Sequence, residues 1–130
     1  MSETHLPTID ELLRPPTDAE VKAALGQFAA NVREHYGDRL KGIYLFGSRA
    51  RGDHRPDSDA DVAVVLEDGE WIKWQERREL NWLAYQPSLD SGLDIQPWPF
   101  SAQQWLLPEA VATPLVQSAR RDAIPLKCTR

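Results

Sequence analysis

Cysteine is nearly absent from this sequence, and so are long apolar runs. The 130 residues include a single cysteine, Cys128, so no internal disulfide can form. No stretch approaches the length of a membrane span, and residues 1–10 are polar, without the apolar core that a secretion signal requires. We therefore expect a cytoplasmic protein without a membrane segment, because nothing in its composition points to an oxidising compartment.

Positive charge is scarce as well. Lysine and arginine total 15 against 20 aspartate and glutamate residues, which gives a formal net charge of −5. Non-specific binding to a nucleic-acid backbone needs clustered cations, so we expect no strong nucleic-acid binding. Apolar residues make up 42% of the chain and charged residues 27%, which is typical of one globular domain with a real core.

Two prolines separate a tail from the body of the chain. We predict a flexible N-terminal tail at residues 1–16, with a short helix at 8–13, and a single domain at residues 17–130. Pro15 and Pro16 end the short helix, because proline cannot continue a helix and also restricts the residue before it.

The predicted domain opens with a helix start signal. Thr17 is followed three residues later by Glu20, which is the spacing of a capping box. Apolar residues then recur at helical spacing until about Tyr36, where Gly37 supplies a C-terminal stop. We therefore predict a first long helix between these two signals.

The remaining pattern predicts three strands and several helices. Runs rich in β-branched and aromatic residues predict strands at 40–46, 60–66 and 92–98. Helices are predicted at 70–86, 101–107 and 109–121, with a short extended piece at 122–127. Pro97 and Pro99 place the third strand at an edge or at its own end. This order predicts an α/β (α+β) fold, a small mixed β-sheet with helices packed on it.

The segment with the most chemical content begins directly after the first predicted strand. Glycine at position 47 lets the backbone approach a ligand closely, and Ser48 can begin a short helix whose N–H groups favour an anion, above all a phosphate. The hydroxyl of Ser48 adds a donor, and Arg49 and Arg51 are near enough to add positive charge. Gly47 and Ser48 therefore predict a phosphate-binding turn.

Three aspartates are the candidate metal ligands. Asp59 and Asp61 are two residues apart at the start of the second strand, so their side chains point to the same face. Two such carboxylates repel each other unless a cation lies between them, and hard oxygen ligands suit Mg²⁺. If the third strand lies beside the second, Asp94 faces the same ions and can accept a proton from an attacking hydroxyl.

The spacing of these residues resembles a known signature. Gly47 and Ser48, then ten residues, then Asp59 and Asp61 resemble the motif of the DNA-polymerase-beta-like nucleotidyltransferase superfamily. The form GSRARG…SDAD resembles the superfamily's minimal nucleotidyltransferase (MNT) branch. The resemblance implies the polymerase-beta palm-like nucleotidyltransferase fold.

The same resemblance implies roles for the candidate residues. Gly47 and Ser48 are expected to contact the triphosphate of a nucleotide, with Arg49 as a helper, and two aspartates of the motif are expected to hold Mg²⁺. Asp94 matches the third acid of the family, which completes the metal site and helps to activate the acceptor.

The implied activity is transfer of a nucleoside monophosphate, most simply AMP from ATP, onto an acceptor with release of pyrophosphate. Many MNT proteins are antitoxins encoded beside a HEPN-domain toxin, and some transfer AMP to a toxin tyrosine. The resemblance therefore implies a protein adenylyltransferase with a HEPN-type toxin as partner. Two alternatives stay open: a non-catalytic antitoxin that masks its partner by binding, and a small-molecule nucleotidyltransferase of the aminoglycoside type.

The predicted helix at 70–86 carries two apolar stripes. An aromatic stripe contains Trp71, Trp74, Trp82 and Tyr85, and an aliphatic one contains Ile72, Leu80 and Leu83. Both stripes cannot easily face one small sheet. Either the aromatic side chains belong to the core, or part of their stripe is an interface for a partner protein or a second copy of the chain.

Overall fold

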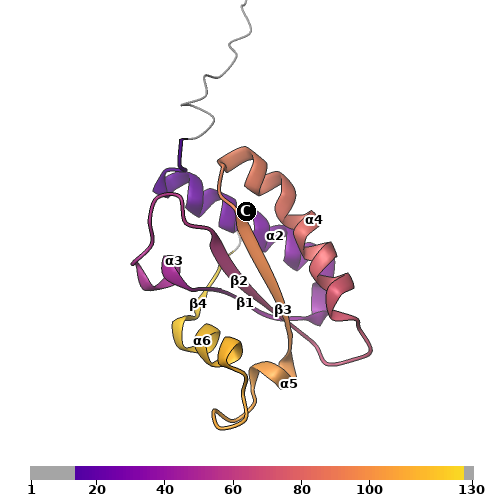
Figure 1. The fold of residues 1–130 in the computed structure, drawn as a ribbon. Helices are drawn as coiled ribbons and strands as arrows, with labels where there is room; N and C mark the ends of the chain where they lie inside the picture. The colour runs from indigo at the N-terminus through magenta and orange to yellow at the C-terminus, as the bar shows by residue number, and fades with distance from the viewer. Residues whose placement is uncertain (1–13, 128–130) are drawn as a thin grey trace, which may run out of the picture.

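A four-stranded mixed sheet lies at the centre of the molecule (Figure 1). The structure is a computed structural model that describes residues 14–127. The strands are β1 (Leu40–Phe46), β2 (Ala60–Leu66), β3 (Ile95–Ser101) and β4 (Ile124–Pro125), in the order β3-β2-β1-β4. β2 and β3 run parallel, whereas β1 is antiparallel to both β2 and β4. The predicted α+β class with a small mixed sheet is thereby confirmed.

Two long helices, α2 (Asp18–Tyr36) and α4 (Lys73–Ser91), cover one face of this sheet (Figure 1). The predicted capping box of α2 is present, since the Glu20 N–H donates to Thr17 Oγ1 over 3.2 Å and the Thr17 N–H donates to Glu20 Oε1 over 3.0 Å. α2 ends at Gly37, as predicted, and a short 3-10 helix, η1 (Gly37–Arg39), leads into β1.

Side chains of β2 alternate between two apolar layers. Ala60, Val62, Val64 and Leu66 pack toward α2 and α4, while Ala63 and Val65 pack with Phe46, Phe100 and Trp105 on the opposite face. Every residue of β2 except Asp61 is buried. The alternation therefore places Asp61 on the second face, at the end of the strand where the apolar layer stops.

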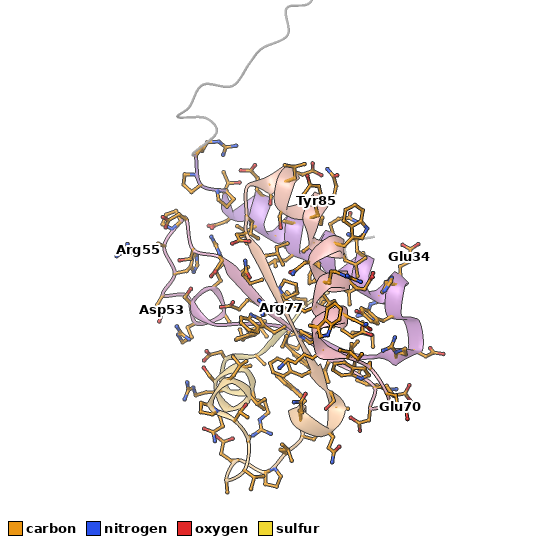
Figure 2. The ribbon with its side chains drawn as sticks, turned by 45° about the vertical axis from the view of Figure 1, so that its right-hand side comes forward. Glu34, Asp53, Arg55, Glu70, Arg77 and Tyr85 are labelled. Carbon is orange, nitrogen blue, oxygen red and sulfur yellow. The ribbon has the colours of Figure 1, made fainter. Side chains whose placement is uncertain are left out.

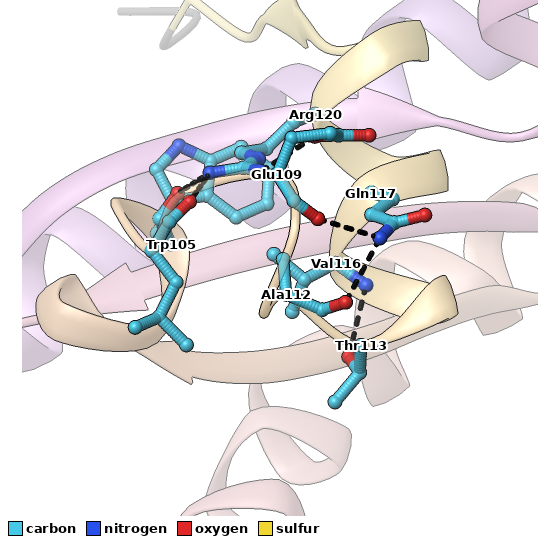
Figure 3. A network of polar contacts seen from close by, with 8 residues as sticks. Trp105, Glu109, Ala112, Thr113, Val116, Gln117 and Arg120 are labelled. Carbon is cyan, nitrogen blue, oxygen red and sulfur yellow. Dashed lines mark hydrogen bonds and ion pairs between the residues drawn. The ribbon is translucent and has the colours of Figure 1, made fainter.

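The second face is covered by α5 (Ala102–Trp105) and α6 (Pro114–Asp122). A polar network joins these two helices and the loop between them (Figure 3). Arg120 donates to the carbonyl oxygens of Trp105 and Leu107 and, over 2.8 Å, to the carboxylate of Glu109. Gln117 donates to the carbonyl oxygens of Glu109 and Ala112, so hydrogen bonds from α6 hold the loop in place.

Helix α4 continues further than the pattern predicted. We expected it at 70–86, ending before Pro87, but it runs from Lys73 to Ser91 with Pro87 inside it. Proline cannot donate to the carbonyl oxygen four residues earlier, which here belongs to Leu83. The side-chain amide of Asn31 in α2 donates to that oxygen over 3.0 Å and replaces the missing bond. Gly92, with a φ of 77°, then ends the helix.

Several other predicted bounds need correction. The third strand begins at Ile95 rather than at 92, so Asp94 lies just before the strand instead of near its middle. The helix expected at 109–121 begins only at Pro114, because Thr113 caps it and proline is favoured in a first helical turn. The helix expected at 101–107 is limited to α5, and the extended piece at 122–127 is reduced to β4.

The expectation about the position of the third strand is confirmed. β3 is an edge strand, as its prolines predicted, and β2 lies between β3 and β1. Within residues 14–127, none of the helices combines the length and the hydropathy needed to cross a bilayer. The helix predicted at 8–13 and Cys128 lie outside the described residues, and the division into a tail and a domain stays a prediction.

Candidate active site

The predicted phosphate-binding turn forms a tight corner between β1 and α3 (Ser48–Arg51). Gly47 adopts a φ of 80° and a ψ of −157°, a conformation that is open almost only to glycine. The backbone N–H groups of Ala50 and Arg51 both donate to the Gly47 carbonyl oxygen over 3.1 Å, which closes the short helix. Ser48, the first residue of the short helix, is partly exposed.

This turn lies directly against Asp61. Phe46, the last residue of β1, is the register partner of Asp61 in β2. A Cβ atom added at Gly47 would lie 2.8 Å from Asp61 Oδ2, which is closer than van der Waals contact permits. The structure thus brings the glycine of the turn close to one aspartate of the motif. That the two share a ligand site stays a prediction.

Asp61 is half-buried and held from one side. The indole Nε1–H of Trp98 in β3 donates to Asp61 Oδ1 over 3.2 Å. Burial raises the pKa of Asp61 above its usual value, the hydrogen bond from Trp98 lowers it in part, and the negative charges of Asp59 and Asp94 raise it further. Asp59 and Asp94 are therefore both near enough to Asp61 for their charges to act on it.

Asp59 and Asp94 enter the sheet side by side. Because β2 and β3 run parallel with Ala60 opposite Ile95, the residues just before each strand are neighbours at the same edge. The Ala60 N–H donates to the Asp94 carbonyl oxygen over 2.9 Å and fixes this juxtaposition. The expectation that the third strand lies beside the second is confirmed, and both carboxylates are exposed.

The carboxylate of Asp94 is engaged by its own strand. The side-chain amide of Gln96, two residues later on the same face, donates to both oxygens of Asp94 over 2.9 Å. Within the part of the chain that the structure describes, no three acidic, histidine or cysteine side chains are arranged closely enough to hold a metal ion. The ligand role of the Asp59, Asp61 and Asp94 set stays a prediction.

Arg49 stabilises the loop between α3 and β2. Its Nε donates to the Ser58 carbonyl oxygen over 2.9 Å, and its Nη2 donates to that of Pro56 over 3.0 Å. In Figure 2 this loop, marked by Asp53 and Arg55, lies on the opposite side of the molecule from α4. The structure thus gives Arg49 a role in shaping the loop, and its contact with a nucleotide stays a prediction.

Arg51 is engaged in ion pairs on the surface. Its Nε lies 3.1 Å from Asp53, and its Nη1 lies 2.7 Å from Asp122 at the end of α6. The pair with Asp122 connects α3 to the second helical layer. Sequence reasoning did not identify Trp98, although its even spacing from Asp94 and Gln96 along a strand was a usable signal.

The raised pKa of Asp61 predicts a specific pH dependence of stability. Because the pKa of Asp61 is higher in the folded than in the unfolded protein, the protonated side chain favours the folded state. This contribution to stability is present at pH values below the unfolded-state pKa, near 3.8, and is lost as the pH rises through the folded-state pKa. Urea unfolding of the wild type and Asp61→Asn without divalent cations should therefore show the variant gaining relative stability between about pH 4 and about pH 7. An equal difference at both values would contradict the burial of this charge.

A comparison with protein families decides the classification of this site. The model of the nucleotidyltransferase domain matches residues 25–100, which is more than half of the chain and includes the turn and all three aspartates. This chain belongs to the nucleotidyltransferase domain family. The resemblance drawn from the Gly-Ser and Asp-Ala-Asp motifs is confirmed at this level, and the prediction of a nucleotidyltransferase is confirmed with it.

Two relatives from Methanocaldococcus jannaschii match part of this chain in sequence, and both carry the provisional name of protein adenylyltransferase. The first is 43% identical over 42 residues, which is 32% of this chain. The match spans only 42% of that relative's length. The second is 30% identical over 78 residues, which is 60% of this chain and 77% of the relative.

A solved structure shares the fold of this nucleotidyltransferase domain. The cyclic dinucleotide synthase CdnE of Elizabethkingia meningoseptica, solved with GTP and Apcpp, superimposes with a TM-score of 0.51 at 17% identity. The match covers 74% of this chain and 45% of the synthase. At this identity the likeness concerns the fold alone, and it confirms the nucleotidyltransferase fold expected from the sequence.

Proposed function

We propose that this protein transfers AMP from ATP onto a protein acceptor in a reaction that depends on a divalent cation. The contact between Gly47 and Asp61 carries the proposal, because it places a turn suited to a triphosphate against a carboxylate suited to the cation. The acceptor hydroxyl attacks the α-phosphorus, and the bond from that phosphorus to the bridging oxygen breaks. Pyrophosphate leaves, and Asp94 takes the hydroxyl proton.

The chemistry of the aspartates fits a divalent cation. Burial is the main cause of the raised pKa of Asp61, and the negative charges of Asp59 and Asp94 raise it further. A cation bound near Asp61 would relieve this repulsion between the carboxylates. All the donors are carboxylate oxygens, which suit Mg²⁺ and leave it free to bind phosphate oxygens. A bound Mg²⁺ would neutralise charge on the triphosphate, while Asp59 and Asp61 hold it and Ser48 orients the phosphates.

An exposed aromatic face on α4 supports a protein as the acceptor. It consists of Trp74, Trp82, Tyr85 and Leu89, whose exposed fractions are 62%, 72%, 57% and 64%. The rings of Trp82 and Tyr85 stack with centroids 6.0 Å apart. These residues are not core, whereas Leu80 of the aliphatic stripe is fully buried. Exposed tryptophan and tyrosine are the residues that dominate protein interfaces.

A hollow on the surface connects the aromatic face to Asp94. A shallow hollow of about 330 Å³ is lined by Tyr85, Ser88, Leu89, Gly92, Leu93 and Asp94. Figure 2 shows Tyr85 on the upper part of α4, beside the end of the sheet where β2 and β3 begin. A protein bound to α4 could therefore present a hydroxyl side chain beside Asp94. The provisional names of the two M. jannaschii relatives agree with a protein substrate.

Replacing the two exposed tryptophans, Trp74 and Trp82, with serine should weaken association with the partner without unfolding the chain. Buried interface tryptophans typically contribute about 2 kcal/mol or more each, so the double variant should lose about 10³-fold in affinity when the two contributions add. Titration calorimetry with the partner measures this loss. The melting temperature should stay close to that of wild type, because exposed substitutions rarely change stability by more than about 0.5 kcal/mol.

The matched control for this surface is Asn81→Ser, which alters an exposed residue of the same helix. It should bind the partner as the wild type does. Unchanged affinity in the double tryptophan variant would exclude the aromatic face as the docking surface. A large fall in melting temperature would instead show that the two indoles contribute to the folded core.

The resemblance to the MNT branch suggests a HEPN-type toxin as the acceptor, and this supplies the direct test. The protein is incubated with ATP, Mg²⁺ and the product of the adjacent gene, and both proteins are then weighed by mass spectrometry. We expect the partner to gain the mass of one or more AMP groups. A partner that binds tightly but gains no mass would support the non-catalytic antitoxin instead.

A further inference from the structure

Trp98 connects three elements around the proposed cation site. It lies in β3 opposite Ala63 of β2, and its indole reaches back along the parallel strands to donate to Asp61 Oδ1. The side chain is partly buried and packs against the apolar layer that contains Phe100 and Trp105. An indole has one N–H donor and no acceptor, so this side chain can only donate to the carboxylate.

Arg77 of α4 lies over the other side of the same indole. Its guanidinium carbon is 4.0 Å from the centroid of the Trp98 ring, within the range of a cation–π contact. Figure 2 shows Arg77 between α4 and the strands, close to the centre of the sheet. The ring is therefore fixed by the cation on one side and by the hydrogen bond to Asp61 at its edge.

These contacts determine how the Asp61 carboxylate is turned. Oδ1 is occupied by the indole N–H, and Oδ2 lies toward Gly47, 2.8 Å from where a Cβ of that residue would be. An aspartate without such a partner can rotate about its side-chain bonds, and each rotation would move Oδ2 away from the turn. The geometry thus selects one orientation before any ligand binds.

We propose that Trp98 and Arg77 are positioning residues that hold Asp61 in the orientation required for binding the divalent cation. This inference rests on the proposed function, because it assigns the cation to Asp61. Groups that orient a metal ligand typically contribute about 10- to 100-fold to metal affinity. Trp98 acts directly through its N–H group, and Arg77 acts through the ring, so their contributions should differ in size.

The test measures binding of Mn²⁺ to the full-length protein by electron paramagnetic resonance of the free ion. Trp98→Phe keeps an aromatic ring beneath Arg77 and removes the N–H donor together with the pyrrole part of the indole, so about 10-fold weaker Mn²⁺ binding is expected. Arg77→Gln should weaken binding by a smaller factor. Trp71→Phe is the matched control, since its indole N–H donates to the Glu67 carbonyl oxygen and not to a carboxylate of the site, and it should bind Mn²⁺ as the wild type does.

Activity separates positioning from packing. In Trp98→Phe, the rate of AMP transfer at saturating Mn²⁺ should return to within a few-fold of wild type, while the Mn²⁺ concentration for half-maximal rate rises about 10-fold. Circular dichroism melting checks that the variant is folded, and Arg77→Gln provides a second probe if it is not.

The outcomes distinguish this inference from the proposed function. Suppose that the wild type binds Mn²⁺, that Asp61→Asn abolishes this binding, and that Trp98→Phe binds Mn²⁺ as tightly as the wild type. This result overturns the role of Trp98 and leaves the proposed function standing. Wild-type protein that binds Mn²⁺ no better than Asp61→Asn overturns the proposed cation site and, with it, the positioning role.

Discussion

Replacing Asp61 with asparagine should reduce AMP transfer by about 10³-fold or more while the protein stays folded. Asparagine has nearly the same shape, and its amide can still be contacted by Trp98, but it lacks the negative charge that a divalent cation needs. We expect the loss to be specific to this residue, because Asp61 is the carboxylate that lies beside Gly47. Radiolabel transfer from ATP to the partner measures the effect.

A carboxylate in the neighbouring loop provides the control for this variant. Asp57 is exposed and lies two residues before Asp59, outside the contact with the turn. Asp57→Asn should therefore transfer AMP at close to the wild-type rate. If Asp61→Asn retained more than a tenth of the activity, the carboxylate would have no essential role in transfer. If the variant lost transfer but still neutralised its partner, the alternative of a purely binding antitoxin would gain support instead.

Replacing Gly47 with alanine should both destabilise the protein and lower its activity. The backbone at Gly47 occupies a region that other residues enter at a cost of about 1–3 kcal/mol. The added Cβ would also press against Asp61 Oδ2 and displace it. We expect a loss of about 1–3 kcal/mol in the free energy of unfolding and at least about 100-fold in transfer rate.

Gly52 is a closely matched control for this second variant. It also has a positive φ, 83°, at the other end of α3, but a Cβ added there meets nothing within 4 Å. Gly52→Ala should cost about 1 kcal/mol of stability from backbone strain and should leave the transfer rate within a few-fold of wild type. Equal losses of activity in both variants would indicate that strain, and not contact with Asp61, is responsible.

The sequence was sufficient where local patterns determine the structure. β1 and β2 lie at the predicted residues. Their runs of β-branched and aromatic residues are bounded by Gly37, Gly47 and the polar loop, so few other strand boundaries fit the sequence. The capping box at Thr17 was equally local. The neighbourhood of Asp59 and Asp94 followed from assuming that β3 lies beside β2, and the parallel register confirms that assumption.

Contacts between distant residues account for what the sequence could not predict. Pro87 was expected to end α4, and nothing near it in the chain indicates that Asn31 would satisfy the carbonyl oxygen left free at Leu83. The pairing of Arg77 with Trp98 likewise joins a helix to a strand, so neither residue was a candidate before the fold was known. Local propensity carries no information on such tertiary contacts.

The aromatic residues of α4 illustrate a case in which the pattern gave two options and the fold selected between them. Periodicity placed Trp71, Trp74 and Trp82 on one stripe without showing whether it faced the core. In the structure Trp71 packs against the core and donates to the Glu67 carbonyl oxygen, whereas the other two are exposed. The position of α2 decides this, because it covers the aliphatic side of α4.

AMP transfer at the proposed site requires a divalent cation and a triphosphate to bind together between the Gly47 turn and the aspartates. The most direct test is a crystal structure with Mn²⁺ and a non-hydrolysable ATP analogue, in which an anomalous difference map locates the metal. We predict a peak in contact with the carboxylates of Asp59 and Asp61, with the phosphates beside Ser48. A peak elsewhere, or a nucleotide bound away from this turn, would contradict the proposed site.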